Sequence, residues 1–583
     1  MSELEFGNWI LICHSDLVIG YSKVNNNMKL TGAEILIECL KREKVEVLFG
    51  YPGGQVLPIF DKLYDAPFKF ILVRHEQAAA HAADGYARAT GKTGVCLATS
   101  GPGATNLTTG IANAYMDSIP MVAITGQVKT FLIGNDAFQE ADVTGITRPI
   151  TKHNYLVKDV RDLARIVREA FYIASTGRPG PVLIDIPSDV QLADTEFIWP
   201  KELDIRGYKP VIFGHPGQIK KAAKLISDAH KPIIYAGGGV ITSGAHQELK
   251  ALAERIQAPV VMTMMGLGGF DGTHPLSLGM LGMHGTAFAN FAIMNADLII
   301  AVGARFDDRV TGRLDAFARK AKIIHIDIDP SSIAKNVEVD IPIVGDAKNI
   351  LGQLLEEIKK TPDTAQWLET IEDWKRKHPL RYKDDGKIKP QYVIEQLYEL
   401  TKGDAIITTE VGQNQMWATQ WYKYTSPRTF ISSGGLGTMG FGFPAAMGAK
   451  IGCPESQVFD IAGDGSIQMN IQELATCVCN KINVKVLILN NGYLGMVRQW
   501  QELFYKKRYS YTSLYNPDFV RLAESYGAAG IRVTKKEEVR PAIEKAIAID
   551  NTVFIDFHIE PEENVYPMVP AGEAIDKMIG GLA

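Results

Sequence analysis

Two side chains with hard oxygen donors follow two apolar runs in the last third of the chain. Asp464 stands between two glycines directly after the run Val458–Ala462, and Asn491 follows the run Val484–Leu489. A carboxylate and an amide oxygen suit Mg²⁺, which keeps its other positions for water and phosphate oxygens. The glycines let backbone N–H groups approach a phosphate. The alternative is a tight turn and an Asn-rich strand exit, but the pair Asn490-Asn491 favours the metal site.

The stretch that joins these two side chains predicts a βαβ unit. Apolar residues recur from Ile467 to Val478 at i, i+4, i+7, i+8 and i+11, which is one stripe of a helix. A right-handed crossover would place Asp464 and Asn491 at neighbouring carboxyl ends of one parallel sheet. Open α/β sheets bind their ligands at that edge.

The same segment carries a family resemblance. Gly463-Asp464-Gly465, 24 further residues and then Asn490-Asn491 resembles the diphosphate–magnesium motif of thiamine-diphosphate enzymes. The continuation Leu494–Trp500 (LGMVRQW) is similar to the acetohydroxyacid synthase (acetolactate synthase) family, biosynthetic catalytic type. The resemblance runs from Met28 to the C-terminus. It implies an enzyme that decarboxylates pyruvate on thiamine diphosphate and transfers the hydroxyethyl unit to a second pyruvate or to 2-ketobutyrate. In the family this is the first common step of branched-chain amino-acid biosynthesis.

Strands alternating with helices predict an α/β fold, which the family resemblance extends to three doubly wound parallel-sheet domains. The expected domains are 28–192 for the aminopyrimidine, 210–358 for FAD and 375–583 for thiamine diphosphate and Mg²⁺. Residues 1–27 are expected to be either a disordered leader or a segment that precedes the true start, the start codon having been assigned too far upstream. Residues 194–210 read as a linker, and a charged stretch, 359–389, is expected to bridge to the last domain.

The segments 98–106 (ATSGPGATN) and 461–470 (IAGDGSIQMN) echo each other as strand, glycine turn and helix. They predict two similar domains, of which the first lacks the acid and should bind no metal.

Composition restricts the class of partner and the compartment. The net charge of −5 favours neither nucleic acid nor an anionic membrane. No apolar run is long enough to span a bilayer. The six cysteines are scattered without metal-ligand spacing, so free thiols in a reducing cytoplasm are expected.

Glu76 is the candidate catalytic acid. It stands at a strand exit just before an alanine-rich helix, within Arg74-His75-Glu76-Gln77. An acid that complements a helix N-terminus is the alternative interpretation. In thiamine-diphosphate enzymes the matching glutamate contacts N1′ of the aminopyrimidine and drives the tautomer that removes the C2 proton. Desolvation would raise the pKa of such a carboxyl group and let it share that proton.

The resemblance also implies residues around the substrate and FAD in the first two domains. Phe138, Gln139 and Lys152 are expected to line the cleft, with Gln139 taking part in catalysis, although a solvated loop is the alternative. The family often has proline where Lys129 stands. The FAD contacts implied by the resemblance are Arg178, Gly239, Met283, His284, Gly303, Arg305, Asp307 and Asp327.

An acid 24 residues past a glycine turn, as Asp327 is past Gly303, is close to the spacing of a ribose partner. Met283, His284 and Arg309 are expected to face the substrate. A lone His284 is also compatible with an ordinary core histidine.

In the third domain Met439 resembles the residue that bends the cofactor so that its 4′-nitrogen nears C2, catalysis by enforced proximity. A core methionine is the alternative.

Tyr493 is expected to give the metal a backbone carbonyl. Trp500 should favour 2-ketobutyrate by burying its extra methylene, worth ~1 kcal/mol, unless it is an ordinary core aromatic. Asn414 stands where the family often has histidine. The cofactor contacts implied here are Gln413, Asn414, Gly437, Met439, Asp464, Gly465, Ser466, Asn491, Leu494, Gly495 and Met496.

Three other interpretations are weighed against this one. A catabolic acetolactate synthase lacks FAD, and the segment Arg305–Arg309 and Trp500 argue against it. Pyruvate oxidase uses FAD as an electron acceptor. A non-catalytic paralogue should have lost Glu76 or Asp464, and both are present. In the family the site lies between two subunits, so a homodimer or homotetramer is implied, and a small regulatory subunit follows by analogy only.

Overall fold

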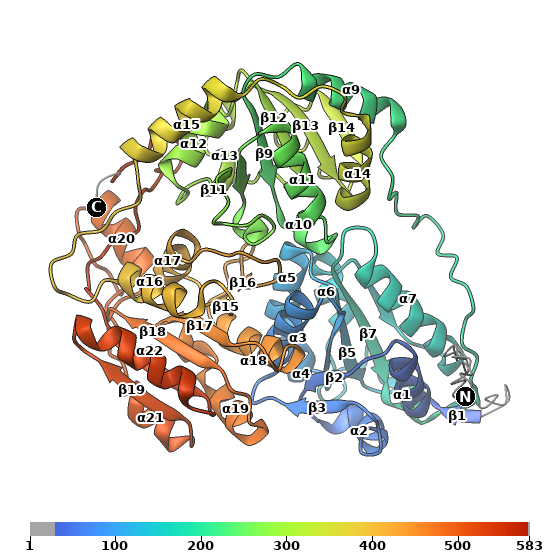
Figure 1. Cartoon of the computed structure of the whole chain (residues 1–583). Coiled ribbons are helices and arrows are strands. Elements are labelled where there is room, and N and C mark those ends of the chain that lie inside the picture. The colour runs from blue at the N-terminus through green and yellow to red at the C-terminus, as the bar shows by residue number, and fades with distance from the viewer. Residues whose placement is uncertain (1–28, 581–583) are drawn as a thin grey trace, which may run out of the picture.

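The computed structural model describes residues 29–580, and the expected leader, 1–27, falls outside them. Figure 1 shows three domains, with the central domain above and the first and third domains side by side below it. Each contains a six-stranded sheet whose strand pairs are all parallel. The α/β fold with three parallel-sheet domains is therefore confirmed. Within residues 29–580, no helix has the length and apolar character to cross a membrane.

The first and third domains have the same topology. Their strand orders are β3-β2-β4-β5-β7-β6 and β16-β15-β17-β18-β20-β19, which is one order when the strands of each domain are counted along the chain. The two echoed segments begin at the ends of corresponding strands, β4 and β17. The prediction of two similar domains is confirmed.

The strands of the first domain are β2 (Val47–Gly50), β3 (Lys69–Leu72), β4 (Gly94–Ala98), β5 (Met121–Gln127), β6 (His153–Leu156) and β7 (Pro181–Pro187). Its helices are α1 (Gly32–Arg42), α2 (Leu57–Leu63), α3 (Glu76–Thr90), α4 (Pro102–Asn106), α5 (Thr108–Asp117), α6 (Val143–Thr147), α7 (Leu163–Ser175) and α8 (Ser188–Leu192). The inner strands β2, β4, β5 and β7 are buried on both faces, as parallel sheets require, whereas the edge strands β3 and β6 are partly exposed.

The central sheet has the order β11-β10-β9-β12-β13-β14. This is the doubly wound order, in which the order of the strands reverses between the first and the fourth strand, here β9 and β12. Its strands are β9 (Pro232–Ala236), β10 (Val260–Met262), β11 (Ser277–Met280), β12 (Leu298–Val302), β13 (Lys322–Asp327) and β14 (Ile341–Val344). Its helices are α9 (Pro216–Ser227), α10 (Gly238–Thr242), α11 (His246–Ile256), α12 (Ala287–Asn295), α13 (Asp308–Thr311) and α14 (Ala347–Glu357).

The third domain begins with α16. Its strands are β15 (Ile406–Thr409), β16 (Phe430–Ser432), β17 (Val458–Gly463), β18 (Lys485–Asn490), β19 (Ala529–Val533) and β20 (Val553–His558). Its helices are α16 (Pro390–Thr401), α17 (Gln413–Trp421), α18 (Gly442–Gly452), α19 (Leu474–Asn480), α20 (Gly495–Phe504), α21 (Phe519–Ser525) and α22 (Val539–Ala548).

Three local predictions need correction. The helix expected over Ile467–Val478 is two 3-10 turns followed by the short α19, because Asn470 leaves the helical conformation and donates to Gly440 O at 2.6 Å. The stretch 194–210, read as a linker, begins with β8 (Asp194–Glu196), which pairs antiparallel with β1 (Lys29–Thr31). The charged bridge contains α15 (Ala365–Lys377), whose Trp367 and Ile371 are buried.

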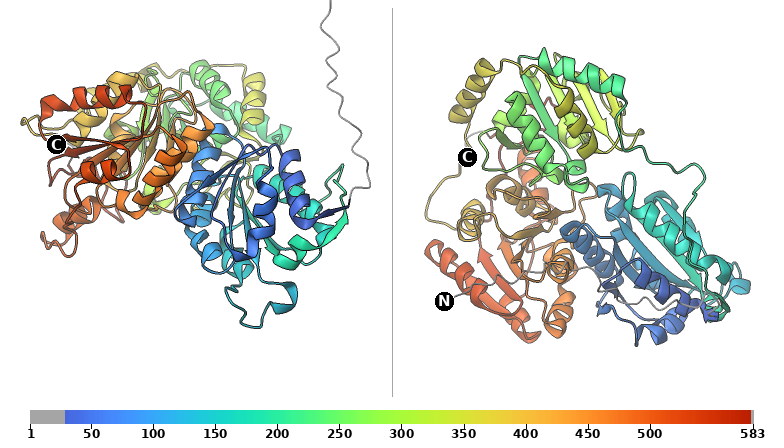
Figure 2. Two further views of the ribbon diagram at one scale, coloured as in Figure 1. Left: turned by 90° about the horizontal axis from the view of Figure 1, so that it is seen from below. Right: turned by 45° about the vertical axis from the view of Figure 1, so that its right-hand side comes forward.

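Helices α3 and α18 join the first and third domains at very short range. A Cβ on Gly85 would lie 2.2 Å from Ala445 O, and one on Gly448 would lie 1.9 Å from Ala82 O. Only glycine permits this approach. Because of this close approach, the alanine-rich helix α3 and helix α18 share one continuous apolar core, and Figure 2 shows the first and third domains side by side.

Candidate active site

Asp464 and Asn491 lie together, as their positions after two apolar runs predict. β17 and β18 pair in parallel with Gly463 opposite Leu489. Asn491 donates its backbone N–H to Asp464 Oδ1 at 3.4 Å. Burial raises the pKa of Asp464 to about 6, and a cation bound beside this carboxylate would oppose that shift.

A pocket of about 40 Å³ opens to solvent at this edge of the sheet. Most of the third-domain residues predicted to bind the cofactor line it, whereas Gly437 and Met496 do not. Its lining comprises Val411, Gly412, Gln413, Asn414, Trp417, Met439, Gly463, Asp464, Gly465, Ser466, Leu489, Asn491, Tyr493, Leu494 and Gly495. The three expected metal ligands thus share one pocket with the expected cofactor contacts.

The donor groups of the pocket fit a magnesium diphosphate. The side-chain donors are a carboxylate and an amide oxygen, and no group of three or more His, Cys, Asp or Glu among residues 29–580 offers a different metal centre. A Cβ on Gly495 would lie 2.1 Å from Gln413 Oε1. This glycine therefore lets the start of α20 approach the pocket floor closely.

The role of Asn414, left open by the sequence, follows from its hydrogen bonds. Its Nδ2 donates to Glu410 O at 2.9 Å and to Ile461 O at 2.7 Å. The side chain therefore ties the exit of β15 to the end of β17 beside Asp464. Its Oδ1 lies 3.3 Å from where a Cβ on Gly463 would stand, so it faces the glycine turn of the pocket.

Sequence reasoning missed Asn516, which comes from the segment between α20 and α21. Its Nδ2 donates to Asp464 Oδ2 at 2.7 Å, and its Oδ1 accepts from Gln468 Nε2 at 3.0 Å. Gln468 also donates to Asp464 O at 2.8 Å. These contacts fix the orientation of the carboxylate. Only an Asn before proline in a polar stretch marks the position, which is a turn signal rather than a site signal.

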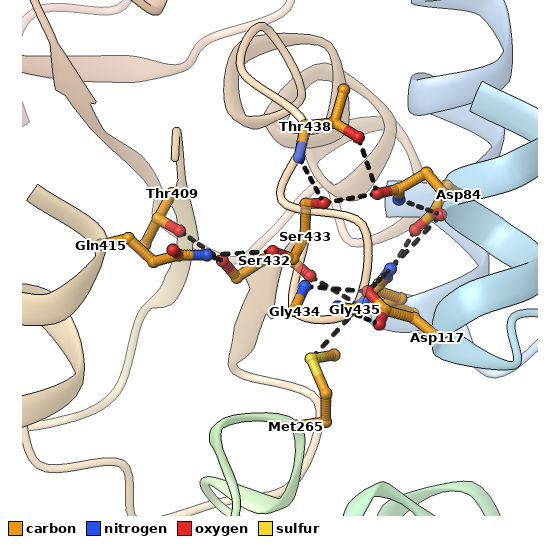
Figure 3. A network of polar contacts seen from close by, with 12 residues as sticks. Asp84, Asp117, Met265, Thr409, Gln415, Ser432, Ser433, Gly434, Gly435 and Thr438 are labelled. Atoms are coloured by element: carbon orange, nitrogen blue, oxygen red, sulfur yellow. Dashed lines mark hydrogen bonds and ion pairs between the residues drawn. The ribbon is translucent and has the colours of Figure 1, made fainter. Parts of the chain in front are cut away.

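The loop that carries Met439, Ser433–Gly440, is held at both ends. Figure 3 shows Asp117 of the first domain accepting from Gly434 N at 3.0 Å and from Gly435 N at 2.7 Å. At the other end Glu410, fully buried, accepts from Gly440 N at 2.6 Å. Met439 lies between the two anchors and lines the pocket.

A buried arginine supports the first of these anchors. Arg88 on α3 donates to Asp117 Oδ2 at 2.9 Å and to Ser432 O at 2.8 Å, and it also pairs with Asp84. Asn113 belongs to the same network. Its Oδ1 accepts from Ser433 Oγ at 2.5 Å and from Thr438 Oγ1 at 3.3 Å. The first domain therefore sets the position of a loop in the third.

Glu76 is the first residue of α3, so the helix-terminus interpretation is correct as a description of its place. Its Oε2 accepts from Asn106 Nδ2 at 2.9 Å. A Cβ on Gly103 would lie 3.4 Å from its Oε1, so the turn after β4 lies directly beside this carboxylate. The carboxylate is half-buried and is absent from the lining of the Asp464 pocket.

The central domain places its glycines at the point where the strand order reverses. Gly239 N donates to Gly303 O at 3.1 Å, and a Cβ on Gly239 would lie 2.6 Å from Gly303 Cα. Asp327 ends the neighbouring strand β13, and burial raises its pKa to about 6. Arg178 of the first domain reaches Asp329 at 3.2 Å. In doubly wound sheets this reversal is where a dinucleotide binds.

Other predicted residues surround these sites without forming one cluster. Phe138 is 84% exposed, and Gln139 has a left-handed backbone beside the turn at Gly101. Lys152 donates from Nζ to Thr176 O at 2.8 Å and to Tyr208 Oη at 3.0 Å. These contacts satisfy its ammonium group without a substrate, so its contact with substrate stays a prediction.

Near the central sheet, His284 is buried and its Nδ1 has no hydrogen-bond partner. Met283 donates its N–H to Arg309 O at 2.8 Å, and the Arg309 side chain is 61% exposed. Arg305 is half-buried, and Asp307 caps α13. Trp500 is half-buried on α20.

Comparison with known proteins agrees with this arrangement. Three family models match in chain order: the N-terminal TPP (thiamine pyrophosphate) binding domain of thiamine pyrophosphate enzymes over 30–146, their central domain over 219–354 and their C-terminal TPP binding domain over 410–557. The acetolactate synthase large subunit of Corynebacterium glutamicum is 52% identical over 559 residues, which is 94% of this chain and 89% of that protein.

The chain belongs to the acetolactate synthase large-subunit family.

Other members are similarly close. Acetolactate synthase isozyme 3 large subunit of Escherichia coli is 50% identical over 563 residues, covering 94% of this chain and 98% of that protein. A probable acetolactate synthase large subunit of Methanocaldococcus jannaschii is 52% identical over 563 residues, covering 94% of this chain and 95% of that protein. As in other thiamine pyrophosphate enzymes, the first and third domains of this family member are the TPP binding domains.

Proposed function

We propose that this chain is the catalytic subunit of an acetolactate synthase. Pyruvate loses CO₂, and its two-carbon unit is joined to a second pyruvate to give 2-acetolactate or to 2-ketobutyrate to give 2-aceto-2-hydroxybutyrate. These products lead to valine, leucine and isoleucine. The observation that carries the proposal is the shared pocket of Asp464, Asn491 and Tyr493 within a TPP binding domain.

The residues have separate tasks in this proposal. Thiamine diphosphate supplies a nucleophilic carbon at C2 when it is bound. Asp464, Asn491 and the carbonyl of Tyr493 hold Mg²⁺ and through it the diphosphate. Met439 would hold the bound cofactor in its reactive conformation, while Gln139 and Phe138 would contact the substrate. The Glu76 carboxyl group shares a proton with N1′ of the aminopyrimidine.

We also propose FAD as a bound cofactor of the central domain. The contacts would come from Arg178, Gly239, Met283, His284, Gly303, Arg305, Asp307 and Asp327. The strand reversal at β9 and β12 supports this proposal, because it is where a doubly wound sheet receives a dinucleotide. The orphaned Nδ1 of buried His284 is a polar atom that a bound ligand could satisfy.

The assembly is proposed to be a homodimer or homotetramer with active sites between subunits. Residues 411–495 alone line the Asp464 pocket, and Glu76 lies outside it. A second copy that supplies Glu76 would complete the site. The relatives are named large subunits, which supports a small regulatory partner.

The test compares the full chain with Glu76→Gln and with an exposed control, Glu524→Gln. We expect the unaltered chain to form acetolactate only with thiamine diphosphate and Mg²⁺ and to carry flavin absorbance. Glu76→Gln should bind the cofactor in calorimetry and lose most activity, while Glu524→Gln keeps it. Full turnover by Glu76→Gln would refute its role. Oxygen or quinone reduction coupled to pyruvate would favour pyruvate oxidase, and activity without flavin would favour the catabolic type.

A further inference from the structure

A buried carboxylate of the third domain binds the backbone of the first domain next to Glu76. Glu473 lies just before α19 and is fully buried. Its Oε1 accepts from Arg74 N at 2.9 Å and from His75 N at 3.1 Å, and its Oε2 lies 3.2 Å from Arg74 N. One side chain thereby holds two successive amides about 400 positions away in the chain.

These two amides have no partner in regular secondary structure. β3 ends at Leu72 and α3 begins at Glu76, so Arg74 and His75 form the turn between them. Backbone N–H groups outside strands and helices need another acceptor, and the buried Glu473 carboxylate provides it. Thr476 strengthens the contact, because its Oγ1 lies 2.7 Å from Glu473 Oε2 and 3.3 Å from Leu72 O.

The position of the turn determines where Glu76 lies. The peptide group of His75 joins directly to Glu76, so a shift of this turn would move the Glu76 carboxyl group with it. On the other side His75 accepts from Gln77 N at 3.2 Å. That contact is local and cannot set the turn relative to the third domain, whereas Glu473 can.

We propose that Glu473 is a positioning residue for Glu76, holding the turn before α3 so that the Glu76 carboxyl group stays where the aminopyrimidine meets it. The inference rests on the proposed role of Glu76. It assigns Glu473 no contact with substrate or cofactor.

A carboxylate suits this position better than an amide. An ionised carboxylate only accepts hydrogen bonds, and here it receives two N–H groups and a hydroxyl. In Glu473→Gln the new NH₂ group would face one of those donors, with almost unchanged volume. The substitution therefore loosens the turn without leaving a cavity.

The experiment measures the exchange of the C2 proton of bound thiamine diphosphate with deuterium, at saturating cofactor and Mg²⁺. The variants are Glu473→Gln, Glu76→Gln, both together and the exposed control Glu524→Gln. We expect Glu473→Gln to slow exchange about ten- to a hundredfold, the size of effect that a misplaced catalytic group causes. Its affinity for thiamine diphosphate in calorimetry should stay within about twofold, because the diphosphate pocket is unchanged.

The double variant decides whether Glu473 acts through Glu76. If it does, Glu473→Gln should add nothing in the Glu76→Gln background. Unchanged exchange in Glu473→Gln, or an equal loss in both backgrounds, would overturn the inference. A wild-type exchange rate in Glu76→Gln would instead refute the proposed function, so the two failures are distinguishable.

A measurement on the unaltered enzyme guards against a variant that fails to fold. Hydrogen exchange of backbone amides should show Arg74 and His75 strongly protected, although they belong to no strand or helix. Rapid exchange at both positions would overturn the inference without any substitution. Glu473→Asp, which keeps the charge and shortens the reach, should restore protection only in part.

Discussion

Asn516 donates a hydrogen bond of 2.7 Å to Asp464 Oδ2, and this contact orients the carboxylate that we propose as a magnesium ligand. Groups that orient a metal ligand typically contribute about 10- to 100-fold to metal affinity. Asn516→Ala should therefore raise the Mg²⁺ concentration needed for half-maximal activity by roughly tenfold or more.

A magnesium titration of the thiamine-diphosphate-saturated enzyme measures this change. The control is Asn295→Ala, which removes an exposed amide on the central domain. At saturating Mg²⁺ the Asn516→Ala enzyme should recover most of its turnover. An unchanged titration midpoint would show that Asp464 needs no such partner.

Arg88→Met tests the buried ion pairs that anchor the Met439 loop. Asp84 and Asp117 are 0% exposed in their side chains, so removal of the guanidinium leaves two uncompensated carboxylates. Breaking a buried pair in this way costs about 3–5 kcal/mol, and the Tm should fall clearly.

Arg161→Met is the matched control, because Arg161 pairs with Asp159 on the surface. Such pairs contribute little, so its Tm should stay near that of the unaltered chain. Equal Tm values for Arg88→Met and Arg161→Met would argue that the network around Asp117 does not stabilise the domain contact.

The sequence predicted strands and strand exits well because they depend on local patterns. The predicted strand Gly94–Ala98 has the same first and last residues as β4. Asp464 and Asn491 lie together because the ends of neighbouring parallel strands meet at one edge of the sheet. Long-range polar partners were not predictable. The apolar stripe from Ile467 to Val478 suggested an unbroken helix, but Asn470 and Glu473 within it form hydrogen bonds to residues outside it.

Asp185 gives the stability a defined pH dependence. It is 1% exposed on β7, and burial raises its pKa to about 7 despite hydrogen bonds from Thr125 and Gln127. The ordinary pKa of an Asp side chain is about 4. Between that pH and pH 7 the folded chain therefore binds more protons than the unfolded chain. Stability from this group therefore falls as pH rises through that window.

Asp185→Asn removes the titration and keeps the shape. We expect its Tm, minus that of the unaltered chain, to increase from pH 4 to pH 7 and to level off above about pH 8, where both reference states are ionised. Thermal melts at matched ionic strength measure the difference. A constant difference, or one that shrinks with rising pH, would contradict burial as the dominant effect at Asp185.

Trp500→Leu tests the choice of second substrate. The Trp500 ring is half-buried on α20 and packs edge-on against Phe504, with 6.2 Å between centroids. A flat surface that buries one more methylene discriminates by ~1 kcal/mol. The preference for 2-ketobutyrate over pyruvate should therefore fall about fivefold in a competition assay. Trp374→Leu, on α15 of the charged stretch between the central and third domains, should leave the product ratio unchanged. If both variants keep the ratio, Trp500 is an ordinary core aromatic, and the preference must come from other residues.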